Sequence, residues 1–107
     1  MSRHTQRSFE VFLEDEHRKV MLEYFKGYVF AHITFYGNSF EAYKKTKREF
    51  HTILDFTKSK GYNYLLTYTK NAKFVKKLYN PEYVSSFTHN NEIYEVYRWD
   101  LTQYQSP

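Results

Sequence analysis

Hydrophobic and polar residues alternate through the first third of the chain, a pattern that predicts short β-strands. Apolar side chains recur at every second position near residues 9–13, 20–25 and 28–36. Polar stretches at 14–17 and 26–27 separate these runs and predict turns. The first third is therefore expected to form a meander of three antiparallel strands.

A helical period replaces the alternation at residues 40–60. Apolar side chains recur there every three or four positions and include Tyr43, Phe50, Ile53 and Leu54. Asn38 or Ser39 can cap the start, with Glu41 placed to complete a capping box on Asn38. Gly61 is a typical helix stop. The pattern predicts one long helix with a single buried face.

The second half continues with a strand at 62–69, a short helix at 72–79 and a hairpin of strands 83–88 and 93–101 around the turn 89–92. A strand, a long helix and a second strand form a crossover unit whose strands are parallel. The sequence thus predicts a single α+β domain over residues 1–107, with the order β-β-β-α-β-α-β-β and a mixed, mostly antiparallel sheet. Residues 1–8 and 102–107 are expected to be loose tails.

Composition excludes several kinds of chemistry. The chain has 107 residues, enough for one core, and no cysteine, which excludes disulfides, a thiolate nucleophile and cysteine-bound zinc. Its five histidines show no metal-site spacing, so no metal is predicted. No apolar run approaches the roughly 18 residues of a membrane span. We therefore expect no membrane partner and a cytoplasmic location, in the host cytoplasm or virion if a phage encodes the chain.

Charge is distributed unevenly along the chain. The net charge is +4, yet five of the twelve acidic residues lie in the first quarter, and Lys44, Lys45, Lys47 and Arg48 follow one another without an intervening acid. These four residues form either a solvated face or a contact surface for an anionic partner. The 12 Tyr and 10 Phe can fill a core, and exposed Tyr or sheet edges could support a homo-oligomer.

A local motif raises the possibility of nucleic-acid binding. Residues 26–33 resemble the RNP1 octapeptide of RRM domains, with matches at Lys26, Gly27, Tyr28 and Phe30. In that family the two aromatic residues stack on bases. Only about 25 residues precede the motif, and they are patterned as strands. An ordinary amphipathic strand is the alternative explanation.

The element order resembles another family more extensively. Residues 61–68, followed by Asn71 and the run 74–78, are similar to the Gly-led strand and short helix near the end of GNAT-type N-acetyltransferases. The resemblance covers roughly residues 9–101 and lacks that family's first strand and most of its opening helices. The compact GNAT-like proteins of tailed bacteriophages are similar in the second half, including the basic helix start.

The GNAT resemblance implies an acetyl-CoA site between strands 28–36 and 62–69. Its candidate cofactor-binding residues are Ala31, Ile33, Ser39, Lys44 and Lys45. His32 and Tyr79 are the candidate catalytic residues. The family's glycine-rich phosphate loop falls on residues 41–46, which contain no glycine and place Glu41 where a cation is usual. Val75 occupies the position of a tyrosine that often protonates the leaving thiolate.

These departures lead to a functional expectation. We expect a degenerate GNAT-like protein that acts mainly by binding another protein, in virion assembly or host takeover by a phage, without efficient catalysis. Its expected partner-binding residues are Lys44, Lys45, Lys47 and Arg48. One alternative is a minimal acetyl-CoA-dependent N-acetyltransferase, and a second is a small basic RNA- or DNA-binding protein.

Overall fold

The structure is a computed structural model that describes residues 7–37 and 39–107. Strands β1 (Ser8–Glu14), β2 (Arg18–Phe25) and β3 (Tyr28–Phe35) precede the long helix α1 (Phe40–Ser59). Strand β4 (Tyr64–Thr69), the short helix α2 (Ala72–Val75) and strands β5 (Glu82–His89) and β6 (Glu92–Asp100) follow. The predicted order of elements is confirmed.

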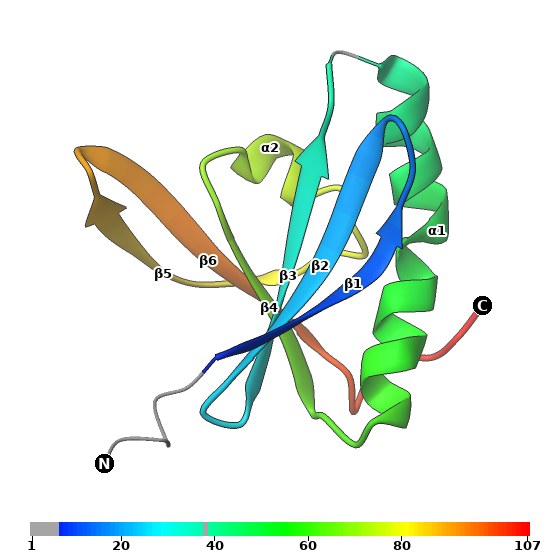
Figure 1. Cartoon of the computed structure of the whole chain (residues 1–107). Helices are drawn as coiled ribbons and strands as arrows, with labels where there is room; N and C mark the ends of the chain where they lie inside the picture. The colour runs from blue at the N-terminus through cyan, green and yellow to red at the C-terminus, as the bar shows by residue number, and fades with distance from the viewer. Residues whose placement is uncertain (1–6, 38) are drawn as a thin grey trace.

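All six strands form one sheet in the order β1-β2-β3-β4-β6-β5. Strands β3 and β4 are parallel, because α1 carries the chain back between them, and the other neighbouring pairs are antiparallel. Figure 1 shows α1 along one side of the sheet and the β5–β6 hairpin extending away on the other side. The predicted α+β class and mixed, mostly antiparallel sheet are confirmed.

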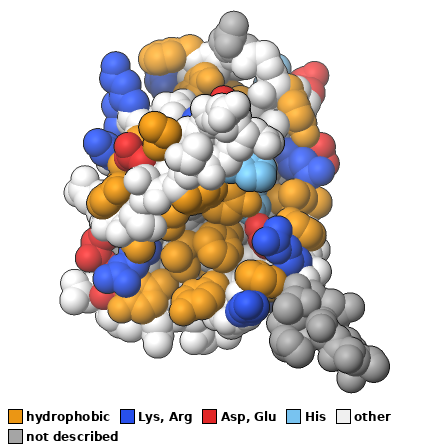
Figure 2. Space-filling model, turned by 90° about the vertical axis from the view of Figure 1, so that its left-hand side faces the viewer, with side chains coloured by type: hydrophobic (Ala, Val, Ile, Leu, Met, Phe, Trp, Pro, Cys, Tyr) orange, Lys and Arg blue, Asp and Glu red, His pale blue; other side chains and the backbone are white. Residues whose placement is uncertain are grey.

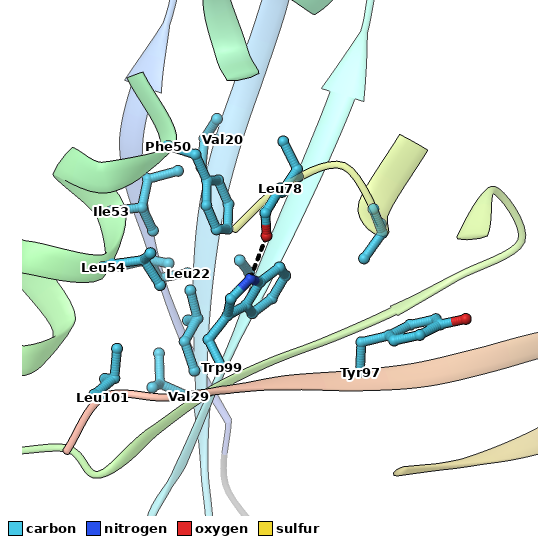
Figure 3. Close-up of a cluster of buried hydrophobic side chains, with 13 residues drawn as sticks. Val20, Leu22, Val29, Phe50, Ile53, Leu54, Leu78, Tyr97, Trp99 and Leu101 are labelled. Carbon is cyan, nitrogen blue, oxygen red and sulfur yellow. Dashed lines mark hydrogen bonds between the residues drawn. The ribbon is translucent and has the colours of Figure 1, made fainter. Parts of the chain in front are cut away.

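The hydrophobic core lies between α1 and the face of the sheet that α1 covers. Its members alternate along the strands and repeat at helical spacing on α1, as Figure 3 shows. The largest buried side chains include Phe50, Leu22, Leu54 and Leu65. The indole N–H of Trp99 donates to the backbone carbonyl of Leu78, so the one polar atom of this ring is satisfied inside the core.

Helix α2 ends earlier than the pattern at 72–79 predicted. After Val75 the chain continues in tight turns, in which the backbone N–H of Lys77 donates to Phe74 and that of Leu78 to Val75. Tyr79 and Asn80 then have positive φ values of 55° and 47°, which no right-handed helix accommodates. The hairpin turn is also shorter than the predicted 89–92, because β5 extends to His89 and β6 begins at Glu92. Asn90 and Asn91 form the turn with positive φ.

The structure describes only part of the two segments expected to be loose tails, residues 1–8 and 102–107. Residues 1–6 lie outside the described part of the chain, and β1 already begins at Ser8. At the other end, the hydroxyl of Tyr104 donates to the carbonyl of His51 at 3.3 Å, and Nζ of Lys58 donates to the carbonyl of Tyr104 at 2.8 Å. Tyr104 therefore anchors the C-terminal segment on α1.

Helix α1 is capped by Ser39, whose hydroxyl oxygen accepts from the backbone N–H of Ala42 at 3.2 Å. The predicted alternative cap, Asn38, lies outside the described residues, and so does its capping box with Glu41. No helix within residues 7–37 and 39–107 is long and apolar enough to cross a membrane.

Candidate functional site

The parallel strands β3 and β4 separate and leave a cleft between them. A single register pair joins them, Phe30 with Leu66. The hydroxyl of buried Thr67 donates to the carbonyl of Ala31 at 2.7 Å. This bond gives the carbonyl of Ala31 a hydrogen-bond partner at the point where the two strands separate. The cleft has a volume of about 260 Å³. Its lining includes Ile33 and His32, whereas the carbonyl of Ala31 is occupied by Thr67.

His32 connects this cleft with the face of the sheet opposite α1. Its Nε2 lies 2.7 Å from Oε1 of Glu23, a side chain that is only 5% exposed. A carboxylate only accepts hydrogen bonds, so the neutral imidazole carries its proton on Nε2 and keeps Nδ1 as an acceptor. The ring also packs edge-on against Tyr68, with centroids 5.0 Å apart. This arrangement fixes the orientation of the imidazole and would allow Nδ1 to accept a proton.

A basic groove lies beside the cleft, between the start of α1 and the region of α2. Its volume is about 360 Å³. Its lining, which we call the lysine groove, consists of Phe40, Tyr43, Lys44, Lys47, Asn71, Lys73, Phe74 and Lys77. Four of these residues are lysines and none is an acid. The groove therefore favours a ligand that carries negative charge.

Aromatic rings form the apolar part of the lysine groove. The rings of Tyr43 and Phe74 in this lining contact each other and also contact Phe35, which lines the neighbouring cleft, with centroids 4.2 to 5.4 Å apart. Phe74 and Asn71 also line the cleft between β3 and β4, so the groove and the cleft are neighbours. Nζ of Lys44 lies 5.5 Å from the centroid of the Phe40 ring and 3.8 Å from the carboxylate of Glu41. That exposed ion pair is weak and leaves Lys44 available.

The four expected partner-binding residues do not share one surface. Lys44 and Lys47 line the lysine groove, whereas Lys45 and Arg48 line a separate pocket of about 140 Å³ near the turn before β2. Ser39 lies in that second pocket with Lys45, together with the carboxylates of Asp15 and Glu41. The expected phosphate-binding set, Ser39, Lys44 and Lys45, is therefore divided between two pockets.

The two candidate catalytic residues are also apart. Tyr79 lines a third pocket, of about 400 Å³, that includes Tyr104, Glu82 and Arg98 and shares no residue with the cleft that contains His32. The ring of Tyr79 packs near Tyr104, with centroids 6.0 Å apart. His32 and Tyr79 therefore do not form one acid–base pair.

The expected base-stacking residues lie away from the lysine groove. Tyr28 is 56% exposed on β3, and Phe30 packs edge-on against Tyr68 on the face opposite α1. Neither residue lines the groove that contains Lys44 and Lys47. Within residues 7–37 and 39–107, no group of three His, Asp or Glu side chains is placed to hold a metal ion.

The sequence analysis did not single out two of the four lysines that line the lysine groove. Lys73 and Lys77 were not singled out, although their four-residue spacing next to Phe74 would place them on one face of a helical turn. It also noted Glu23 only as one of the acidic residues of the first quarter. Glu23 is buried where β2 pairs with β1 and β3, an arrangement that local periodicity does not contain.

The fold and these cavities define a small α+β protein with a basic, aromatic groove beside a divergent pair of parallel strands. Comparison with family models, with curated proteins and with solved structures found no match to the chain.

Proposed function

We propose that this chain is a GNAT-like binding protein without efficient catalysis, and that its lysine groove binds an acidic segment of a protein partner. The observation that carries the proposal is the groove itself, which combines four lysines and three aromatic rings with no acid in its lining. Such a surface suits a peptide with carboxylates around an apolar anchor. A phage protein of virion assembly or host takeover remains the proposed biological setting.

Two further observations support this reading. The single register pair between β3 and β4 supports the proposal, because the GNAT resemblance implies a ligand site between these two strands. The candidate catalytic residues His32 and Tyr79 lie in different cavities, and the phosphate-binding set is divided. A scaffold that keeps the architecture but separates these groups is better suited to binding than to acyl transfer.

The test is a calorimetric titration of the protein with a five-residue acidic peptide, Asp-Glu-Phe-Glu-Asp, at 150 mM salt. The double variant Lys44→Glu/Lys47→Glu removes two attractive charges from the groove and adds two repulsive ones. At about 0.5 kcal/mol for each exposed charge pair, four changes should weaken binding by roughly 2 kcal/mol, or about 30-fold.

The matched control is Lys45→Glu/Arg48→Glu, which changes the net charge of the same helix equally but lies outside the groove. We expect this control to weaken binding less than threefold. Equal losses in both double variants would show only general electrostatic attraction. That result, or no binding of the acidic peptide, would overturn the proposal.

A minimal N-acetyltransferase is the second candidate, because the lysine groove adjoins the cleft that contains His32. It predicts saturable acetyl-CoA binding and acetyl transfer to an amine, with binding weakened by Lys44→Glu/Lys47→Glu. Micromolar affinity for acetyl-CoA would favour this candidate over the first. No heat of binding up to millimolar acetyl-CoA would exclude it.

A further inference from the structure

A further cavity, separate from the four described above, lies on the face of the sheet opposite α1. Its volume is about 470 Å³. Its lining, which we call the aromatic basin, consists of Arg7, Glu23, Phe25, Phe30, Tyr68, Phe87, His89, Tyr94 and Val96. Figure 2 looks toward this side, where hydrophobic side chains fill the centre and charged side chains lie directly beside them. The basin shares no residue with the lysine groove.

The rings of the basin contact one another and are held in place. Tyr68 packs edge-on against Phe30 and Phe87, at centroid distances of 5.9 and 5.7 Å. Phe87 stacks on Tyr94 at 5.2 Å with nearly parallel planes. Aromatic faces carry partial negative charge, so a hollow surrounded by them favours a flat or compact cation.

A buried carboxylate adds a full negative charge to this lining. Glu23 projects from β2 and is 4% exposed, yet most of its neighbours in the basin are aromatic. Oε1 of Glu23 is paired with His32, and Oε2 pairs with a cation on the basin side. A carboxylate removed from water in this way requires a partner, because burial without one is costly.

That partner is a guanidinium group that the chain itself supplies. Nε of Arg7 lies 3.3 Å from Oε2 of Glu23, and Cζ of Arg7 lies 4.8 Å from the centroid of the Phe25 ring. The side chain of Arg7 is nevertheless 56% exposed. The guanidinium side of this pair is open to solvent, so a competing cation can approach the same carboxylate oxygen and displace Arg7.

We propose that the aromatic basin is a binding site for an arginine side chain of a partner protein, and that Arg7 occupies its carboxylate in the free protein. The incoming guanidinium would pair with Oε2 of Glu23 and stack on the aromatic lining. The other cations near the basin are compatible with this role. Lys70 is paired with Glu92 at 2.8 Å, and Lys26 lies over Phe25 without lining the cavity.

This site is independent of the proposed function, because it takes a cation on a different lining. The probe is the peptide acetyl-Gly-Arg-Gly-amide, titrated into the full chain while the side-chain NMR signals of His32 and Tyr68 are followed. Its neutral counterpart carries citrulline in place of arginine. We expect the arginine peptide to shift these signals saturably and the citrulline peptide to leave them unchanged.

Removing the internal competitor should strengthen binding. Since Arg7 competes for Oε2 of Glu23, Arg7→Ala should tighten the arginine peptide about two- to fivefold. Lys26→Ala is the matched control, because it removes the same charge over the same ring but no lining residue. It should change the affinity less than twofold.

Removing the carboxylate should abolish the effect. Glu23→Gln should weaken binding of the arginine peptide at least tenfold. Phe25→Leu keeps the carboxylate and serves as the second variant if Glu23→Gln does not fold; it should weaken binding at least threefold. Equal binding of the citrulline peptide would overturn the proposal. So would unchanged affinity in Arg7→Ala, or an arginine titration that leaves the signals of His32 and Tyr68 in place.

Discussion

Arg18 is a buried cation that joins the sheet to the first half of α1, and its replacement by methionine should destabilise the protein measurably. The side chain is 4% exposed. One terminal nitrogen donates to the hydroxyl of Thr46 at 2.8 Å, and the other donates to Oε1 of Glu49 at 2.7 Å. Both acceptors are on α1, so this residue fixes the helix segment that also carries Lys44 and Lys47.

The size of the effect follows from these two contacts. A hydrogen bond from a charged donor to Thr46, which is buried, is worth about 1.5–3 kcal/mol. The pair with Glu49, whose side chain is 39% exposed, adds about 0–1 kcal/mol because water can replace it. The two contributions span about 1.5–4 kcal/mol. Methionine keeps most of the side-chain volume, so we take the middle of that range and expect Arg18→Met to lower the free energy of unfolding by about 2–3 kcal/mol.

Urea unfolding followed by far-UV circular dichroism measures this change. With an m-value of about 1.5 kcal/mol per molar urea, the midpoint should fall by roughly 1.3–2 M. Lys45→Met is the matched control, since Lys45 is exposed on the same helix and should change stability by less than about 0.5 kcal/mol. A loss below about 1 kcal/mol for Arg18→Met would refute the reasoning that these bonds hold α1.

Two further outcomes are expected from the same assay. Trp99→Phe leaves the buried carbonyl of Leu78 without its donor and should lower stability by about 1–3 kcal/mol, whereas a loss below about 0.5 kcal/mol would mean that water replaces the indole. The hydrogen bond to Glu95 raises the pKa of Tyr97 to about 12, and burial raises the pKa of Tyr104 to about 12. In the unfolded chain these tyrosines lose their protons near pH 10, whereas the folded protein keeps them up to about pH 12. The stabilisation from the two protonated hydroxyls is therefore complete below pH 10, and the free energy of unfolding should fall between about pH 10 and 12. Tyr97→Phe should make that fall shallower, and an equally steep fall would contradict the assignment.

Local pattern was sufficient for the element order because each element carries its own periodicity. Buried apolar side chains recur at every second position in β2 and β3, and buried positions on α1 include Phe50, Ile53 and Leu54 at helical spacing. The lone parallel pair was also predictable, since a long helix between two strands requires a crossover. These features depend on residues close together in the sequence.

The candidate sites were less predictable because distant residues create them. Lys44 and Lys47 acquire Lys73 and Lys77 as neighbours only after α2 lies beside the start of α1. Likewise, the basic run was predicted as one surface, but the helix directs Lys45 and Arg48 into a different pocket. Adjacent residues on a helix point in directions about 100° apart, so a continuous run of charge in the sequence seldom remains one patch.

The early end of α2 connects the core with the lysine groove. Regular helix stops after Val75, and the carbonyl of Leu78 accepts from the indole N–H of Trp99, a bond that ties the segment after α2 to β6. Leu78 is fully buried at that point. Lys77, its neighbour, is therefore held at the surface, on the lining that also contains Phe74. The left-handed backbone of Tyr79 then turns the chain away toward β5. A continuous right-handed helix through residue 79 would require a negative φ at Tyr79, so the left-handed backbone found there ends the helical segment and places Lys77 on the proposed binding surface.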